Sequence, residues 1–235
     1  MSVANVRNGR RPGPGERPDR YGMMFVLLLA SFIVAGVLDG RLARLVTLLL
    51  YVVALILALR FARLPASTAR LLRHLLVAGS ALVAVLVIAV HGPVIEGIAA
   101  IWTAAFLLLT VFVVVGRVLR HRVVTMQTIF GALSAYLLVG FFFVALFTAA
   151  ARLAPGPFFA GGEPADGDAI QYFAFITLTT TGYGDLTPAS APGRSLAVLD
   201  ALCGQIFLVT LVARLVSVFG TERRRPSDDV APADG

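Results

Sequence analysis

Three threonines followed by Gly-Tyr-Gly-Asp form the stretch of this chain best suited to chemistry. They occupy 179–185, directly after an apolar segment. Gly182 and Gly184 can adopt a positive φ without steric cost, which lets neighbouring backbone carbonyls turn to the same side. In a channel, a cage of such oxygens replaces the hydration shell of an alkali cation. The stretch is therefore predicted to line a path for cations.

The segment before it, 169–179, is apolar but only about half as long as a membrane-crossing helix. Asp168, with Gln171 three residues later, predicts a capping box for a helix that starts near Ala169 and ends near Thr179. The carbonyl end of this re-entrant helix would point into the membrane. Irregular backbone beyond it is tolerated at that depth only where protein surrounds it or where it lines a watery path.

The composition indicates an integral membrane protein. Hydrophobic residues make up 58% of the chain and charged residues 14%, against about 25% charged in soluble domains. The net charge is +7, and every basic residue is an arginine, mostly beside an apolar run, which favours a lipid surface over a nucleic acid. The one cysteine, Cys203, excludes an intrachain disulfide and a cysteine-based zinc cluster.

Six stretches approach the roughly 20 apolar residues that a crossing helix needs: 21–38, 42–60, 71–91, 94–116, 127–150 and 194–219. We assume that the chain enters and leaves the membrane on the same side at segment 169–179. Sixteen of the twenty arginines then lie on the same side of the membrane as both termini. The positive-inside rule then predicts cytoplasmic termini in the plasma membrane. The expected fold is all-α, with six transmembrane helices, a re-entrant pore helix and a filter loop. Its parts are a disordered tail (1–20), a four-helix peripheral domain (21–116), an interfacial linker (117–126), a pore domain (127–219) and a second tail (220–235).

The run Thr180-Thr181-Gly182-Tyr183-Gly184-Asp185 resembles the T-x-G-Y-G filter of the potassium channel family. The likeness proper covers about 127–219, whereas 1–126 matches only in hydropathy and number of spans. It implies that K⁺ binds to the backbone carbonyls of Thr180, Thr181, Gly182 and Tyr183. The Thr180 hydroxyl would complete the innermost ring of oxygens. It also implies supporting roles around them: Thr179 and Gly184 beside the filter, Tyr172 and Phe173 as an aromatic surround for Tyr183, and Asp185 at the outer mouth.

Two departures from the family pattern are visible. Thr181 stands where Val or Ile is frequent, and Ile176 offers no carboxylate for a clamp to Asp185. Because one loop supplies a quarter of each carbonyl ring, the resemblance implies a homotetramer. Its partners are further copies of itself and the bilayer, with permeant K⁺ and no cofactor.

The last span carries the candidates for a gate and cavity. Gly204 is either a hinge or a site of close helix packing, and both interpretations remain open. Gln205, Leu208 and Val212 share a helical face that would line a cavity. Asp200 lies off that face, and an acid at this depth is a functional candidate. We expect it to contact the pore helix.

Weak or absent voltage dependence is expected. The fourth span contains Glu96 and no arginine, and Arg117 and Arg120 follow it, although a sensor must hold charge within the field. The nearest alternative function is a nonselective cation channel. A secondary transporter would show a repeat with paired broken helices, and a membrane scaffold would leave Thr180–Gly184 unexplained. An enzyme is disfavoured because, apart from Asp200, the sequence offers no strongly placed buried acid, base or nucleophile for catalysis.

The loop before the re-entrant helix is acidic. Glu163, Asp166 and Asp168 lie within GGEPADGD. They are interpreted either as a solvated loop or as a vestibule that concentrates cations.

Overall fold

The computed structural model describes residues 21–37, 46, 49–54, 56–57, 66–90, 92–120 and 126–222. Within them the chain is helical, apart from loops and one isolated bridge between Phe159 and Pro188. The all-α prediction is therefore confirmed for the described part. The expected tails at 1–20 and beyond 222, and most of the expected second span at 42–60, lie outside the described residues.

Among the residues that the structure describes, three helices are long and apolar enough to cross a membrane. They are α4 (Pro93–Arg120), α5 (Met126–Leu153) and α7 (Ala191–Glu222). The expected first span forms α1 (Tyr21–Val37), and the third forms α3 (Ala66–Ala89), of which the apolar part is Leu76–Ala89. Both apolar stretches are shorter than 18 residues. The structure thus supports a membrane protein, and six crossings remain a prediction.

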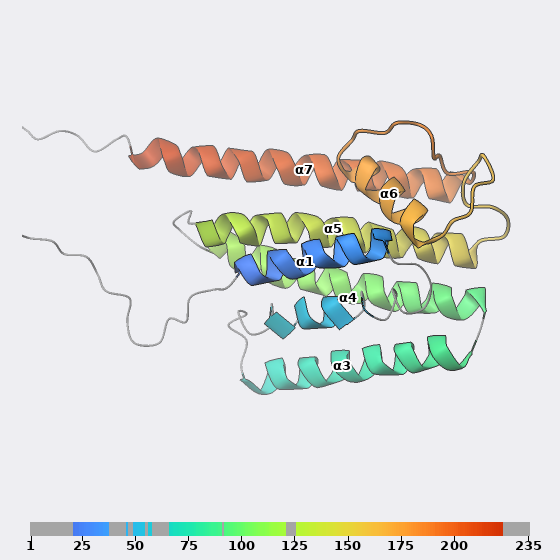
Figure 1. Cartoon of the computed structure of the whole chain (residues 1–235). Coiled ribbons are helices and arrows are strands. Elements are labelled where there is room, and N and C mark those ends of the chain that lie inside the picture. Colours follow the sequence, from blue (N-terminus) through green and yellow to red (C-terminus); the bar gives the residue numbers. More distant parts are fainter. Residues whose placement is uncertain are drawn as a thin grey trace, which may run out of the picture.

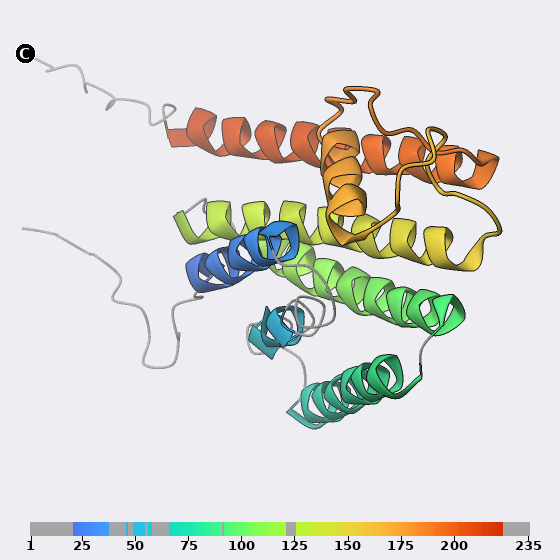
Figure 2. The same ribbon diagram turned by 45° about the vertical axis from the view of Figure 1, so that its right-hand side comes forward.

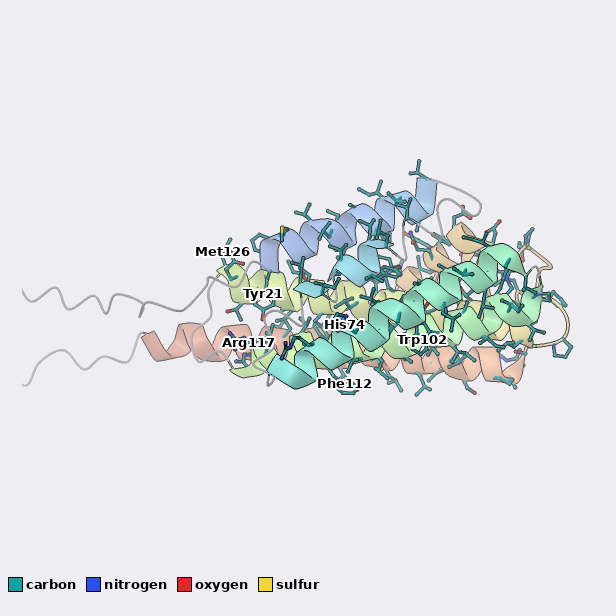
Figure 3. All side chains as sticks on the ribbon, turned by 90° about the horizontal axis from the view of Figure 1, so that it is seen from below. Tyr21, His74, Trp102, Phe112, Arg117 and Met126 are labelled. Atoms are coloured by element: carbon teal, nitrogen blue, oxygen red, sulfur yellow. The ribbon has the colours of Figure 1, made fainter. Side chains whose placement is uncertain are left out.

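The long helices α3, α4, α5 and α7 alternate in direction and form a bundle together with α1, which runs in the same direction as α3 and α5 (Figures 1 and 2). α4 and α5 form a hairpin packed along its length, α3 lies outside α4, and α7 lies on the opposite side of α5. The start of α1 at Tyr21, the start of α5 at Met126 and the last turns of α4 near Arg117 are at the same end of the bundle (Figure 3). We call this the Arg117 end. The opposite end, which carries 154–166 and 179–190, is the filter end (Figure 1).

Two buried clusters hold the bundle together. The larger joins α1, α4 and α5 through Leu28, Leu107 and Phe141 among others, each at most 1% exposed. In addition, Gly79 of α3 leaves room for the Trp102 ring of α4, labelled in Figure 3. Because α4 and α5 share most of this core, the two helices are expected to move as one unit.

The smaller cluster is largely aromatic and lies at the filter end. Phe143 and Phe147 of α5 pack with Phe158, Phe159 and Phe173. The Phe147 and Phe173 rings meet edge to face, with centroids 4.9 Å apart, a favourable aromatic geometry. This cluster joins the loop at 154–166 to the short helix above it, so it positions the candidate site.

Candidate ion-binding site

The short helix α6 (Gly167–Leu178) lies across the bundle, between α5 and α7 (Figure 2). The expected half-length helix is present at the expected place, but its cap was predicted wrongly. Asp166, not Asp168, is the N-cap, and its side chain accepts a hydrogen bond from the Ala169 N–H at 3.1 Å. An Asp at either position of Asp-Gly-Asp offers the same acceptor, so the sequence alone does not choose between them.

Gln171 does not close a capping box. Its Nε2 instead donates to the Phe32 carbonyl of α1 over 3.0 Å, and its side chain is buried. Beside it, the Phe32 and Phe175 rings meet edge to face at 4.8 Å. The first helix is therefore joined directly to the short helix, a contact that no local pattern in the sequence indicates.

The chain turns back over the carbonyl end of α6. The Ile176 carbonyl accepts from the N–H groups of Thr181 (2.9 Å) and Gly182 (3.2 Å), and Thr180 N–H donates to Thr177 O (2.9 Å). Each of these donors satisfies a carbonyl that the helix end leaves without a partner in the helix. The loop is thus held against the helix by its own backbone.

Beyond this turn, the backbone alternates between left-handed and ordinary conformations. Thr180, Gly182 and Gly184 have φ values of 56°, 50° and 81°, and no other non-glycine residue among those described has a positive φ. The sequence predicts this conformation at the two glycines but not at Thr180, because a β-branched residue there is a true outlier. Such strain costs about 1–3 kcal/mol and occurs mainly at functional sites.

Side chains brace the loop from two directions. Thr179 Oγ1 lies 2.8 Å from the Phe175 carbonyl, to which it donates, and 2.9 Å from Thr181 Oγ1. At the outer side, the Tyr172 hydroxyl donates to Asp185 Oδ2 at 2.8 Å. A tyrosine hydroxyl is protonated at neutral pH, so it acts as the donor to the Asp185 carboxylate.

The return from the loop to α7 is fastened to the preceding loop. Ala160 N–H donates to Thr187 O and Ala189 N–H donates to Phe158 O, each over 2.8 Å. Because Phe158 and Phe159 are buried in the aromatic cluster, the two loops at the filter end form one packed layer.

Small residues let the long helices approach the carbonyl end of α6. A Cβ on Gly204 of α7 would lie 2.9 Å from the Leu178 carbonyl carbon and closer still to its oxygen. On the other side, a Cβ on Gly140 of α5 would meet the Phe175 ring. The Tyr136 hydroxyl also points to Leu178 O at 3.5 Å. Of the two interpretations of Gly204, the geometry directly supports close packing.

Comparison with known proteins agrees with this geometry. Residues 165–221 match a family described as ion channels. A stretch of 51 residues is 45% identical to "Probable potassium channel protein 2" of Methanocaldococcus jannaschii, and it covers 22% of this chain and 15% of that protein. No solved structure matches the chain significantly.

Residues 165–221 of this chain are thus similar to ion channels. The match includes the last residues before α6, α6 itself, the loop after it and nearly all of α7, and it leaves out α1, α3, α4 and α5. In the matched segment the predicted filter residues, Thr180–Tyr183, form the strained loop. Phe173 is buried in the aromatic cluster, against Phe147, Phe158 and Phe159, and not against Tyr183. Tyr183 is 72% exposed and has no ring contact within the described part of this single chain.

The candidate residues for a gate and cavity in α7 separate into two faces. Gly204 is buried against α6, whereas Gln205, Leu208 and Val212 lie on an exposed face of the single chain. Asp200, one turn before Gly204, is 0% exposed. Neither of its carboxyl oxygens has a hydrogen-bond partner among the described residues, so the expected contact with the pore helix includes no hydrogen bond.

Some supporting residues were missed from the sequence. Asp166 caps α6, Phe32 ties it to α1, and Tyr136 and Gly140 contact its end. Of these, Tyr136 carries a usable signal, because a buried tyrosine in an apolar helix usually finds a polar partner. Of the acidic loop, Glu163, Asp166 and Asp168 are all exposed, and Asp166 has the structural role of a cap.

Proposed function

We propose that this protein is a subunit of a channel that conducts K⁺ passively and selectively. The observation that carries the proposal is the alternation of left-handed residues at Thr180, Gly182 and Gly184, directly after the carbonyl end of a half-length helix. Such alternation is what successive carbonyls need in order to face one axis. The ligands would be the carbonyls of Thr180, Thr181, Gly182 and Tyr183, with no cofactor.

The proposed assembly is a homotetramer, since one loop supplies a quarter of each oxygen ring. Two features of the single chain support further contacts. The Tyr183 side chain lies mostly exposed next to the filter. In addition, α7 presents an exposed apolar face that includes Leu202, Ile206 and Val209. Apolar surface of this extent is expected to be covered by lipid or by neighbouring subunits.

Weak or absent voltage dependence is part of the proposal. The apolar part of α4 carries Glu96 and no arginine before Arg117. Glu96 pairs with Arg152 of α5 at 3.0 Å, and near the Arg117 end Arg214 of α7 donates to the Val118 carbonyl over 3.3 Å. A helix tied in this way at both ends, with so little charge in the field, is a poor voltage sensor. The proposed orientation keeps both termini in the cytoplasm, in the plasma membrane.

The test compares two glycine substitutions of equal local strain. Gly184 (φ 81°) and Gly162 (φ 84°) are both left-handed, and a Cβ at either meets nothing within 4 Å. Alanine should therefore cost a similar amount at each, about 1–2 kcal/mol. We expect Gly162→Ala to keep the K⁺-selective reversal potential in planar bilayers with mixed K⁺ and Na⁺, and Gly184→Ala to lose it.

Several results would contradict the proposal. A wild-type reversal potential that does not distinguish K⁺ from Na⁺ would establish a nonselective cation channel. Slow saturable flux without unitary currents would indicate a carrier, and no flux would indicate a scaffold. Equal behaviour of the two alanine variants would show that the loop at 180–184 is not the filter.

A further inference from the structure

The Ile176 carbonyl is the point at which the end of α6 holds the loop. It accepts hydrogen bonds from the N–H groups of Thr181 at 2.9 Å and Gly182 at 3.2 Å. Two successive N–H groups of the backbone thus converge on one oxygen, as in an anion-binding nest. In a planar trans peptide group, the N–H and the carbonyl point to opposite sides. The single acceptor therefore turns two proposed ligands, the carbonyls of Thr180 and Thr181, away from α6 in a common direction.

Thr181 is held at a second point, by its side chain. Its Oγ1 lies 2.9 Å from Thr179 Oγ1, which lies 2.8 Å from the Phe175 carbonyl. A hydroxyl has one proton to donate, and a carbonyl can only accept. Because the Thr179 proton is directed to Phe175, the bond between the two hydroxyls is donated by Thr181. We call this directed chain, from Thr181 through Thr179 to the Phe175 carbonyl, the hydroxyl latch.

The latch adds something that the expected ligand set does not require. The proposed ligands at this point are backbone carbonyls, and Val or Ile, which are frequent at the position of Thr181 in the family pattern, would supply the same carbonyl. Thr181 has no positive φ, so valine fits its backbone without strain and has nearly the same shape. The hydroxyl is thus the one feature that Thr181→Val removes, while the N–H bond to Ile176 remains.

We propose that the Thr181 hydroxyl is a positioning group for selectivity, because the latch keeps the peptide group between Thr181 and Gly182 from rotating. The inference rests on the proposed function, in which the Thr181 carbonyl is a K⁺ ligand. Selectivity depends on the number and placement of the oxygens that replace the hydration shell, and a carbonyl that turns aside changes both. Thr179 and Thr181 are exposed on the single chain, so the latch is fully effective where neighbouring copies exclude water from it.

The first test measures whether the latch exists. Full-length protein in lipid nanodiscs is exposed to D₂O, and exchange of the amides of Thr181 and Gly182 is followed by fragmentation mass spectrometry. Thr181→Val should speed this exchange about fivefold, the change that corresponds to one net hydrogen bond of about 1 kcal/mol. Thr181→Ser keeps the hydroxyl and should exchange at the wild-type rate. Equal rates in the wild type and Thr181→Val would overturn the proposal.

The second test measures whether the latch sets selectivity. In planar bilayers with mixed K⁺ and Na⁺, Thr181→Val should lower the K⁺ over Na⁺ permeability ratio about fivefold, and Thr181→Ser should restore it. Thr179→Val should match Thr181→Val, and the double variant should show no further loss, because both changes open the same chain of bonds. The control is Thr148→Val, whose hydroxyl donates to the Val144 carbonyl within α5 at 2.8 Å. It should leave both the ratio and the exchange unchanged.

The outcomes separate this inference from the proposed function. A selective wild type whose permeability ratio is unchanged in Thr181→Val, despite faster exchange, would show that the latch has only a structural role, and would refute the inference alone. Additive losses in the double variant would show that the two hydroxyls act independently, which also refutes the latch. A wild type that does not distinguish K⁺ from Na⁺ would contradict the proposed function and the role in selectivity together, whatever the exchange rates.

Discussion

Gly204→Ala is the substitution for which the structure makes the sharpest prediction. The added methyl group would lie 2.9 Å from the Leu178 carbonyl carbon and closer to its oxygen, whereas carbon atoms pack at about 3.5–4.0 Å. The obstructing atoms belong to the backbone, so no rotamer change relieves the contact. Either α7 moves away from the pore helix or the end of α6 moves toward the filter loop.

The expected cost is about 1–3 kcal/mol, the usual penalty for overpacking a filled site. A second consequence is specific to this position. Leu178 directly precedes the cap Thr179, whose hydroxyl bonds to Phe175 O and to Thr181. A displacement of Leu178 therefore reaches the strained loop within two residues, and we expect Gly204→Ala to lower the K⁺ over Na⁺ permeability ratio as well as stability.

Gly116→Ala is the matched control. Gly116 lies inside α4, and a Cβ there meets nothing within 4 Å, so alanine should be neutral or stabilise the helix by up to about 1 kcal/mol. Both variants are compared by thermal unfolding in detergent and by reversal potentials in planar bilayers. If Gly204 is a hinge instead, Gly204→Ala will change the open probability and leave unfolding and selectivity at wild-type values. That outcome would refute the packing argument.

Two further predictions concern the pore helix. Tyr172→Phe removes the 2.8 Å hydrogen bond to Asp185. Because the pair is exposed, the loop should lose about 1 kcal/mol of stability. We expect the K⁺ current to decay faster during long recordings, with unchanged selectivity. Current that decays at the wild-type rate would show that the bond does not stabilise the filter. Gln171→Leu removes the buried bond to the Phe32 carbonyl and should lower the thermal midpoint by about 2–4 °C, and an unchanged midpoint would show that α1 does not brace α6.

The sequence predicted the short helix and the position of the loop after it well, because their signals are local. A half-length apolar run, a threonine series and two glycines lie within 20 residues of one another, and the structure turns them into a short helix and a strained loop at the expected positions. The wrong N-cap has an equally local cause, since Asp166 and Asp168 flank one glycine and each is a good cap.

The contacts that hold this loop in place were not predictable in the same way. Gln171 and Phe32 are 139 residues apart, and Leu178 meets Gly204 only because α7 folds back over α6. No periodicity within a helix reports its partner on another helix. The left-handed conformation of Thr180 was missed as well, because distant surroundings impose a conformation that its own side chain opposes.

These contacts imply unequal coupling of the outer helices to the pore. α4 is fixed to α5 by the Glu96–Arg152 pair and to α7 by the bond from Arg214 to Val118, so a sliding motion of α4 would break interactions at both of its ends. α1 instead reaches the pore helix itself, through one hydrogen bond from Gln171 and one aromatic contact of Phe32. A stimulus that shifts α1 therefore acts on the filter by a shorter route than one that pulls on α4. For the proposed channel, the effective stimulus should accordingly be sought among those that act on the first helix.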